Sequence, residues 1–596
     1  MNTPETLTQL FFDAVDRFSS KRAALRFKKG GSWHDITHHE LARQVQHAAL
    51  GMLELGIKPG DKIAIISANC PEWAIADYAC LTACCADVPV YPTLPANQVE
   101  YILKDSETTA VFVQDRDQLG KVLESKDGLP ALKHIVSFEE GIDVPDVLGL
   151  QDLIRIGAAA EQDHPDYRDN ARAVEKDALA TLIYTSGTTG NPKGVMLTHH
   201  NITSNVLAGL EVIQIGPDDS CLSLLPLSHV FERMAGHYIM LHAGTTINYA
   251  ESIEQVPANM GEIRPTIVLS VPRLFEKIYA RVLENAMAGS ALKRRIFFWA
   301  RSTAERWADL KLAGKSISVG LGIKKAVADK LVFSKLQART GGRIRFFVSG
   351  GAPLSPEIAR FFYAAGIPIL EGYGLTETSP LIAVNPLESP RMGTVGPAVP
   401  GVEVRFAPDG ELLTRGPHVM QGYYNKATET SEAIDADGWF HTGDIGEFDS
   451  QNYIKITDRK KDIIVTAGGK NIAPQPIENR VKTNKFILNA VMIGDKRKFP
   501  IMLVVPDEEA VSRWAADRRI TIVSNRLLTH PDVAAMLERE VMGNLRDLAS
   551  YEMPKKILIV EQDFTIDSGE LTPTLKVKRN VVEKRLAEKI EELYRE

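Results

Sequence analysis

The sequence predicts an α/β protein with a large N-terminal domain of two parallel-type sheets and helices, a β-rich subdomain, and a small mobile α+β C-terminal domain. Short, nearly continuous apolar runs alternate with helical patterns before Arg391, as expected for parallel strands covered by helices on both faces. Beyond Arg391, Gly- and Pro-rich turns separate short strand-like pieces, which is typical of hairpins.

The elements expected near the N-terminus are an amphipathic helix, a short strand pair and a second helix that ends at Gly56. The first helix is indicated by the apolar spacing of Leu7, Leu10, Phe11, Ala14, Val15 and Phe18. The candidate strands that follow are residues 62–67, 109–113, 134–137, 180–185, 221–225, 245–248, 266–270, 344–349 and 368–371.

Composition favours a soluble globular protein, because 44% of the 596 residues are hydrophobic and 24% are charged. The N-terminus has no basic flank followed by an apolar core, so no signal peptide is expected. The most apolar window, residues 74–90, is too short to span a bilayer and contains Asp77 and Asp87. Five cysteines without metal-binding spacing indicate a reducing compartment. We therefore expect a cytoplasmic protein.

One segment differs in charge from the rest of the chain. Residues 293–345 contain fourteen Lys/Arg and three Asp/Glu, a net of +11 in a chain whose total is −7. Apolar residues recur at helical spacing, namely Ile296, Trp299, Ala300, Thr303 and Trp307. This stripe predicts either a helix that packs on the protein body or a peripheral contact with the inner face of a membrane.

The stretch from Tyr184 to Gly194 is the strongest candidate for a binding site. Its glycines and hydroxyls can form a loop whose N–H groups converge on an anion. The expected ligands of a phosphate are Thr185, Ser186, Gly187, Thr188, Thr189, Gly190 and Lys193. Pro192 precedes Lys193 and Gly194 follows it, so the loop is not a Walker A motif. The alternative is a flexible turn between a strand and a helix.

Two further glycine clusters follow predicted strands. The run 371–378 contains Gly372, Tyr373, Gly374, Thr376 and Glu377. Glycine allows a ligand to approach the backbone, and a glutamate oxygen suits Mg²⁺ beside phosphates. The run 349–354 is a weaker signal when taken alone.

The sequences of these loops resemble the motifs of the adenylate-forming superfamily. The matching motifs occur in the family's order over about residues 180–580. They are most similar to the branch of bacterial long-chain fatty acid–CoA ligases. The resemblance implies ATP, Mg²⁺ and coenzyme A as cofactors or co-substrates. It assigns adenine contacts to Gly351, Ala352, Pro353, Gly372, Tyr373 and Gly374, the α-phosphate to Thr376, the metal to Glu377, and the ribose to Asp444 and Arg459.

The resemblance also implies which residues act in catalysis: Lys193, His229, Thr376, Glu377 and Lys576. Lys576 corresponds to the C-terminal catalytic lysine of the family, although Leu575 stands where many members have glycine. Lys578 is the competing candidate. An amino-acid-activating enzyme would need an acidic anchor near Leu225, and Glu232 is expected to pair with Arg233 or a backbone group instead.

The domain boundaries also follow from the resemblance. The charge run 458–462 reads by itself as a solvated turn, and in the family it matches the hinge at Lys461. The expected domains are residues 1–457, a hinge at 458–461, and a lid of residues 462–596 whose loop Gly468–Asn471 swings towards the active site.

The implied reaction converts a long-chain fatty acid to acyl-AMP and then to acyl-CoA. The alternatives are an acyl-AMP ligase that loads a carrier protein, a ligase for shorter or aryl acids, and a degenerate binding protein that should have lost Lys576 or Glu377. The expected partners are small molecules, with no nucleic acid. Chain-length preference, pathway and oligomeric state stay open.

Overall fold

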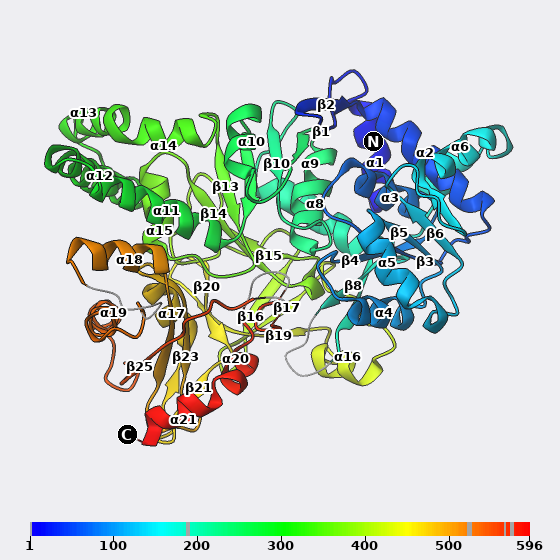
Figure 1. The fold of residues 1–596 in the computed structure, drawn as a ribbon. Helices are drawn as coiled ribbons and strands as arrows, with labels where there is room; N and C mark the ends of the chain where they lie inside the picture. Colours follow the sequence, from blue (N-terminus) through cyan, green and yellow to red (C-terminus); the bar gives the residue numbers. More distant parts are fainter. Residues whose placement is uncertain (1–2, 186–190, 521–526, 566–567, 573–576, 596) are drawn as a thin grey trace.

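The computed structural model describes residues 3–185, 191–520, 527–565, 568–572 and 577–595. Two large sheets with helices form the N-terminal part, and a smaller α+β unit lies beside them (Figure 1). The predicted α/β fold is confirmed.

The first large sheet has the strand order β15-β14-β13-β12-β10-β11-β1-β2. Its interior pairs are parallel, whereas the edge strands β15 and β2 are antiparallel to their neighbours. Its strands are β1 (Leu25–Lys29), β2 (Ser32–Ile36), β10 (Ser220–Ser223), β11 (Thr246–Tyr249), β12 (Ile267–Ser270), β13 (Phe346–Ser349), β14 (Ile369–Gly374) and β15 (Leu381–Val384).

The second large sheet has the order β18-β9-β8-β4-β3-β5-β6-β7. The central strand β4 was absent from the predicted strands, although all five of its residues are buried. Asp87 and Pro89 interrupt its apolar pattern, and the strand was therefore not predicted from the sequence. The strands are β3 (Lys62–Ile66), β4 (Ala86–Val90), β5 (Ala110–Val113), β6 (His134–Ser137), β7 (Val147–Gly149), β8 (Leu179–Thr185), β9 (Lys193–Thr198) and β18 (Gly422–Tyr423).

The β-rich subdomain is an antiparallel sheet of four strands, as the turn-rich sequence predicted. It consists of β16 (Glu403–Phe406), β17 (Glu411–Arg415), β19 (Phe440–Phe448) and β20 (Ile454–Arg459). The C-terminal unit follows with β21 (Ile464–Val465), β22 (Asn471–Ile472), β23 (Ile487–Ile493), β24 (Ile501–Pro506) and β25 (Ile557–Ile559).

Several helices begin after a residue whose side chain accepts a free backbone N–H group of the first turn. Thr37 and Glu40, for example, form a reciprocal capping box at the start of α2. In the N-terminal part the helices are α1 (Leu7–Arg17), α2 (His38–Glu54), α3 (Pro71–Thr82), α4 (Ala96–Asp105), α5 (Arg116–Glu124), α6 (Leu150–Ala159), α7 (Tyr167–Arg172), α8 (His199–Val212), α9 (Ile239–His242), α10 (Val256–Ile263), α11 (Pro272–Met287), α12 (Ala291–Leu312), α13 (Val319–Ala328), α14 (Ser334–Arg339), α15 (Pro356–Ala364) and α16 (Ala427–Ala433).

The C-terminal helices and the short helical turns complete the fold. The C-terminal helices pack around β23 and β24 with a hydrophobic core of their own. They are α17 (Pro474–Lys482), α18 (Glu508–Asp517), α19 (Pro531–Gly543), α20 (Arg579–Arg585) and α21 (Ala587–Arg595). The 3₁₀ turns are η1 (Lys126–Gly128), η2 (Glu161–Asp163) and η5 (Thr376–Thr378), and the π-helical turns are η3 (Glu232–Tyr238) and η4 (Asp329–Phe333).

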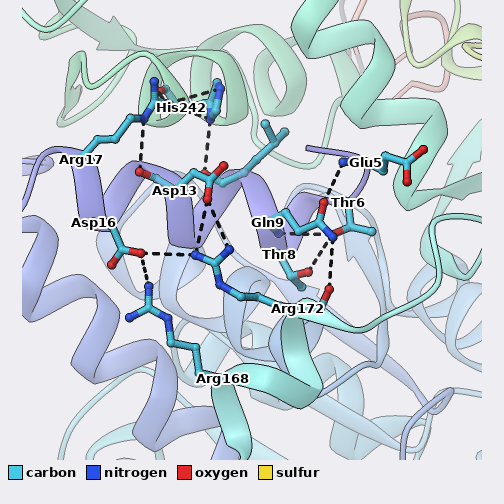
Figure 2. A network of polar contacts seen from close by, with 11 residues as sticks. Glu5, Thr6, Thr8, Gln9, Asp13, Asp16, Arg17, Arg168, Arg172 and His242 are labelled. Atoms are coloured by element: carbon cyan, nitrogen blue, oxygen red, sulfur yellow. Dashed lines mark hydrogen bonds and ion pairs between the residues drawn. The ribbon is translucent and has the colours of Figure 1, made fainter. Parts of the chain in front are cut away.

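Helix α1 confirms the first predicted helix and is anchored on both of its faces. Its apolar side chains are buried, and Thr6 caps its first turn by accepting from the N–H of Gln9 at 3.2 Å. On the polar face, Arg172 of α7 lies 3.4 Å from Asp13 and 3.3 Å from Asp16 (Figure 2). These contacts hold the N-terminal segment against the second sheet and its helices.

No helix among the described residues combines the length and the apolar character that are needed to cross a membrane.

Candidate functional site

The candidate phosphate loop, within the stretch from Tyr184 to Gly194, connects two antiparallel strands. The alternative interpretation from the sequence was a flexible turn between a strand and a helix. The register of β8 and β9 sets Thr185 opposite Lys193 and Tyr184 opposite Gly194. Thr185 and Lys193 therefore face each other where the loop begins and ends. The other loop residues assigned to the phosphates lie outside the described residues: Ser186, Gly187, Thr188, Thr189 and Gly190.

Aromatic side chains fix the base of this loop. Tyr184 donates its hydroxyl to Asp105 at 2.7 Å, and Tyr101 donates to the carbonyl of Pro192 at 3.2 Å. Burial, followed by the Asp105 carboxylate, raises the pKa of Tyr184, so this phenol stays a neutral donor. A Cβ at Gly194 would lie 3.1 Å from the Tyr184 ring, which accounts for glycine at that position.

Tyr423 links the predicted residues Lys193 and Glu377. Its hydroxyl donates to Oε1 of Glu377 at 2.9 Å, and Nζ of Lys193 lies 5.0 Å from the centroid of its ring. Strand β18, which carries Tyr423, pairs with β9. Sequence reasoning missed Tyr423, and the only available signal was the aromatic pair at 423–424 after Gly422.

The position of Glu377 is compatible with a metal ion whose remaining ligands come from substrate phosphates. Among the residues the structure describes, no three His, Cys, Asp or Glu side chains form a metal-binding group. Mg²⁺ at phosphate sites commonly takes one or two carboxylates, and the phosphates complete its shell. Glu377 supplies one carboxylate near a lysine, so the residues present fit this mode.

The predicted glycine-rich run 371–378 begins within β14, which ends at Gly374, and it continues into the turn η5, which contains Thr376 and Glu377. Gly374 allows a close backbone approach, since a Cβ there would lie 1.6 Å from the carbonyl oxygen of Pro380. Met420 donates its N–H to the carbonyl of Glu377 at 2.8 Å. The segment before β18 therefore fixes the position of η5.

The predicted ribose residues are brought together on two adjacent strands. Asp444 of β19 is paired in register with Arg459 of β20. The Arg459 Nε lies 3.1 Å from Oδ1 of Asp444, and the Tyr373 hydroxyl donates to Oδ2 at 2.7 Å. The Asp444 carboxylate raises the pKa of Arg459. Each carboxylate oxygen has a second lone pair, so Asp444 can accept two further hydroxyls.

The run 349–354 approaches Phe231 at Gly350 and Glu371 at Leu354. Gly351 adopts a φ of 80° and is exposed with Ala352, while Pro353 is half-buried. A Cβ at Gly350 would lie 3.0 Å from the ring of Phe231. Beneath the loop, Glu371 accepts the N–H of Leu354 at 3.3 Å, and burial raises its pKa to about 8.

His229 lies two residues before Phe231 in the chain. Its Nδ1 accepts the N–H of Phe231 at 3.2 Å. An accepting Nδ1 carries no proton, so the neutral ring carries its proton on Nε2. This hydrogen bond fixes the tautomer of the half-buried imidazole.

The expectation that Glu232 pairs with Arg233 or a backbone group is wrong. Oε1 of Glu232 accepts from the Ser223 hydroxyl at 2.7 Å, and burial raises the pKa of Glu232 to about 8. Arg233 instead contacts Asp77 at 2.5 Å, and it also contacts Asp87. The two acids that interrupted the apolar window are thus the buried counter-ions of Arg233.

The C-terminal residues are placed only in part. Lys576 lies outside the described residues, whereas Lys578 precedes α20 and donates its N–H to the carbonyl of Glu570 at 2.7 Å. Lys461 and the loop 468–471 are exposed. The charge run is only partly solvated, because Asp458 is 1% exposed and burial raises its pKa to about 7.

Three contacts join the C-terminal unit to the large one, and one of them involves Pro353 of the predicted site. Arg273 lies 3.1 Å from Asp563, and Arg513 pairs with Glu284. The Asn479 amide donates to the carbonyl of Pro353 at 3.5 Å.

Comparison with known proteins places this geometry in a family. The family described as AMP-binding enzyme matches residues 11–424, and its AMP-binding enzyme C-terminal domain matches residues 461–596. The chain belongs to the AMP-binding enzyme family. A long-chain-fatty-acid–CoA ligase of Mycobacterium tuberculosis is 39% identical over 95% of this chain and 93% of its own length. One from Xenopus laevis is 32% identical over 100% of this chain and 84% of its own.

Solved structures share the fold of this AMP-binding enzyme. The anthranilate CoA ligase AuaEII in complex with anthranoyl-AMP has a TM-score of 0.73 at 17% identity and covers 98% of both chains. The A-PCP didomain of the carboxylic acid reductase from Segniliparus rugosus has a TM-score of 0.74 at 21% identity, over 100% of this chain and 82% of its own. The resemblance inferred from the loop motifs is thus confirmed.

Proposed function

We propose that this AMP-binding enzyme is a long-chain fatty acid–CoA ligase that forms acyl-CoA, AMP and diphosphate from a fatty acid, ATP and CoA. The observation that carries the proposal is the 39% identity, over 95% of the chain, to relatives named as long-chain-fatty-acid–CoA ligases. The active-site geometry supports the same chemistry, because Thr185 and Lys193, the Glu377 carboxylate and the ribose acid Asp444 lie on neighbouring elements.

In the first half-reaction the fatty acid carboxylate attacks the α-phosphorus of ATP, an O–P bond forms, and diphosphate leaves. The main obstacle is repulsion between the carboxylate and the phosphates. We assign its relief to Lys193, Thr185, the rest of the loop 186–190, Thr376 and Lys576. Mg²⁺, when bound at Glu377, would neutralise phosphate charge and orient the leaving diphosphate.

In the second half-reaction the CoA thiol loses its proton to solvent, its sulfur attacks the acyl carbonyl, and the C–O bond breaks as AMP leaves with the bonding electrons on its phosphate oxygen. We propose that Asp444 and Arg459 hold the ribose, and that residues 351–353 and 372–374 border the adenine. His229 and Phe231 are proposed to lie where the ATP site meets the acyl site, which agrees with the contact between Phe231 and Gly350.

We also propose a division into residues 1–457, a hinge at 458–461, and a lid of residues 462–596 that rotates between the half-reactions. Three features support it: β20 ends at Arg459, a separate hydrophobic core follows, and the C-terminal family match begins at residue 461. Five free cysteines agree with action in the cytoplasm.

The deciding experiment measures AMP and palmitoyl-CoA produced from ATP, Mg²⁺ and palmitate, with and without CoA. We expect palmitoyl-CoA to form only when CoA is present, at a rate that matches AMP release. Acyl-AMP that accumulates while CoA is ignored would support a carrier-loading ligase instead. Turnover with octanoate or benzoate but not palmitate would identify a ligase for shorter or aryl acids.

A further inference from the structure

Exposed apolar side chains concentrate on one region of the molecule. Fourteen large hydrophobic side chains are exposed in the part of the chain that the structure describes. Eight of them lie between residues 287 and 331: Met287, Leu292, Phe298, Trp299, Val319, Ile323, Val327 and Leu331. These residues belong to the end of α11 and to α12, α13 and η4. Helices α12 and α13 extend outward from the body at the upper left of Figure 1.

Helix α13 presents its apolar side to solvent. Val319, Ile323 and Val327 recur every four residues and therefore share one face, and they are 80%, 62% and 44% exposed. Lys325 points the other way, since it is buried, pairs with Asp329 at 2.6 Å and lies 4.9 Å from the ring of Trp307. A helix on an ordinary water-facing surface has the opposite arrangement.

Helix α12 separates into an inner and an outer face. Phe297, Ala300 and Ala304 are buried against the body, while Phe298 and Trp299 are exposed. The five residues of the apolar stripe predicted from the sequence therefore do not all pack on the protein body: Trp307 packs against the core, whereas Trp299 faces solvent. The predicted stripe did not indicate that α12 and α13 expose other apolar side chains to solvent.

The surrounding charge is strongly positive. Residues 293–345 carry a net charge of +11. Lys293, Arg294, Arg295, Lys324 and Lys330 are exposed on the same helices and turns as the apolar side chains. A second copy of this chain would bring an equal positive charge to the surface, which opposes self-association.

We propose that these helices dock on the surface of an anionic lipid bilayer. The docking face consists of Leu292, Phe298, Trp299, Val319, Ile323, Val327 and Leu331. Its apolar side chains would enter the boundary between headgroups and acyl chains, while the flanking lysines and arginines contact lipid phosphates. Such a helix lies in the plane of the interface, in keeping with the finding that no described helix could span a membrane.

The docking face is separate from the residues assigned to ATP. A long-chain acid partitions into bilayers, so docking would bring the enzyme to its substrate; only this last link rests on the proposed function. Vesicle binding requires no turnover, so failure of the docking proposal and failure of the proposed reaction are distinguishable.

The test is flotation of the full-length protein with vesicles of phosphatidylcholine, with and without 40% phosphatidylglycerol. We expect binding to the anionic vesicles only, weakened by 0.5 M NaCl. The variant Ile323→Ser/Val327→Ser should bind at least fivefold more weakly. The matched control is Ile253→Ser, because Ile253 is 61% exposed against 62% for Ile323 and lies outside the docking face.

A second readout uses brominated phosphatidylcholine in the same anionic vesicles. Quenching of tryptophan emission should fall in Trp299→Phe and persist in Trp307→Phe, since only Trp299 lies on the docking face. Wild-type binding by the Ile323→Ser/Val327→Ser variant, when its thermal unfolding is unchanged, would overturn the proposal. So would equal binding to neutral vesicles, or concentration-dependent dimerisation that this variant abolishes.

Discussion

At the scale of single residues, the most informative side chain is one that no motif identified. Tyr423 contacts both Lys193 and Glu377, by a hydrogen bond from its hydroxyl to the carboxylate and a cation–π contact of its ring with the amine. Burial, followed by the Glu377 carboxylate, raises the pKa of Tyr423. The phenol thus remains a donor at neutral pH, and we interpret it as a positioning residue.

Tyr423→Phe should slow acyl-adenylate formation by about tenfold to a hundredfold. The substitution removes one hydrogen bond to a charged group, which contributes about 1.5–3 kcal/mol, while it keeps the ring beside Lys193. The measurement is ATP–diphosphate exchange as a function of Mg²⁺ concentration, in which the variant should require more Mg²⁺. A structural role alone would leave that dependence unchanged.

The neighbouring Tyr424→Phe is the matched control. Its hydroxyl donates to the exposed Glu107 at 2.6 Å, away from Glu377. It should exchange ATP at the wild-type rate. Equal losses in both variants would contradict a specific role for Tyr423.

At the scale of elements, the π-helical turn η3 brings an arginine into the space between the two large sheets. Arg233 is 1% exposed, and its contacts reach Asp77 of α3, Asp87 of β4 and Thr181 of β8. It also lies 5.5 Å from the ring of Trp73. This one side chain therefore connects three elements beneath the segment that carries His229.

Arg233→Ala should destabilise the N-terminal part by about 3–5 kcal/mol, because it leaves Asp77 and Asp87 buried without a counter-ion. The expected result is a marked fall in thermal and urea unfolding midpoints, or no folded protein at all. The less disruptive Asp77→Asn keeps one acid paired with Arg233, and it should lower the midpoints by a smaller amount.

Arg22→Ala provides the comparison for an exposed pair. Arg22 bonds to Asp35 at 2.9 Å with 88% of its side chain exposed, and such pairs add little stability. Its unfolding midpoints should match those of the wild type. A result for Arg233→Ala that is as mild as that for Arg22→Ala would show that the buried network is not a structural anchor.

At the scale of the whole molecule, the proposed cycle needs two arrangements of the C-terminal unit. The structure holds one arrangement with the pairs Arg273–Asp563 and Arg513–Glu284. Both pairs are partly exposed to solvent, so each stabilises this arrangement only modestly. Weak contacts of this kind suit a unit that must leave its position during turnover.

Lys576→Ala should lose acyl-adenylate formation by at least a hundredfold but still convert supplied palmitoyl-AMP and CoA to palmitoyl-CoA. The reason is that Lys576 is proposed to act only on the carboxylate and the α-phosphate. Each half-reaction is measured separately by chromatography of AMP and acyl-CoA. Lys578→Ala should retain both half-reactions, and an exchange of these two phenotypes would assign the catalytic lysine to position 578.

The sequence by itself determined the fold class, the positions along the chain of most strands of the two large sheets, the helix α1 and the loop motifs that identify the family. These properties depend on local periodicity and on glycines that only certain turns require. Strand β4 was not predicted because Asp87 and Pro89 interrupt its apolar pattern. The partner of Asp87 is Arg233, which lies 146 residues further along the chain.

Only the tertiary structure decided which polar groups meet. Tyr423 reaches Glu377 because β18 pairs with β9, and Glu232 faces Ser223 because the π-helical turn directs Arg233 to the other side. The docking face was likewise a tertiary result, since the direction in which α13 turns its apolar side depends on how Lys325 and Trp307 pack. A sequence specifies such periodicities, but the partners of a side chain are fixed only when distant segments come together.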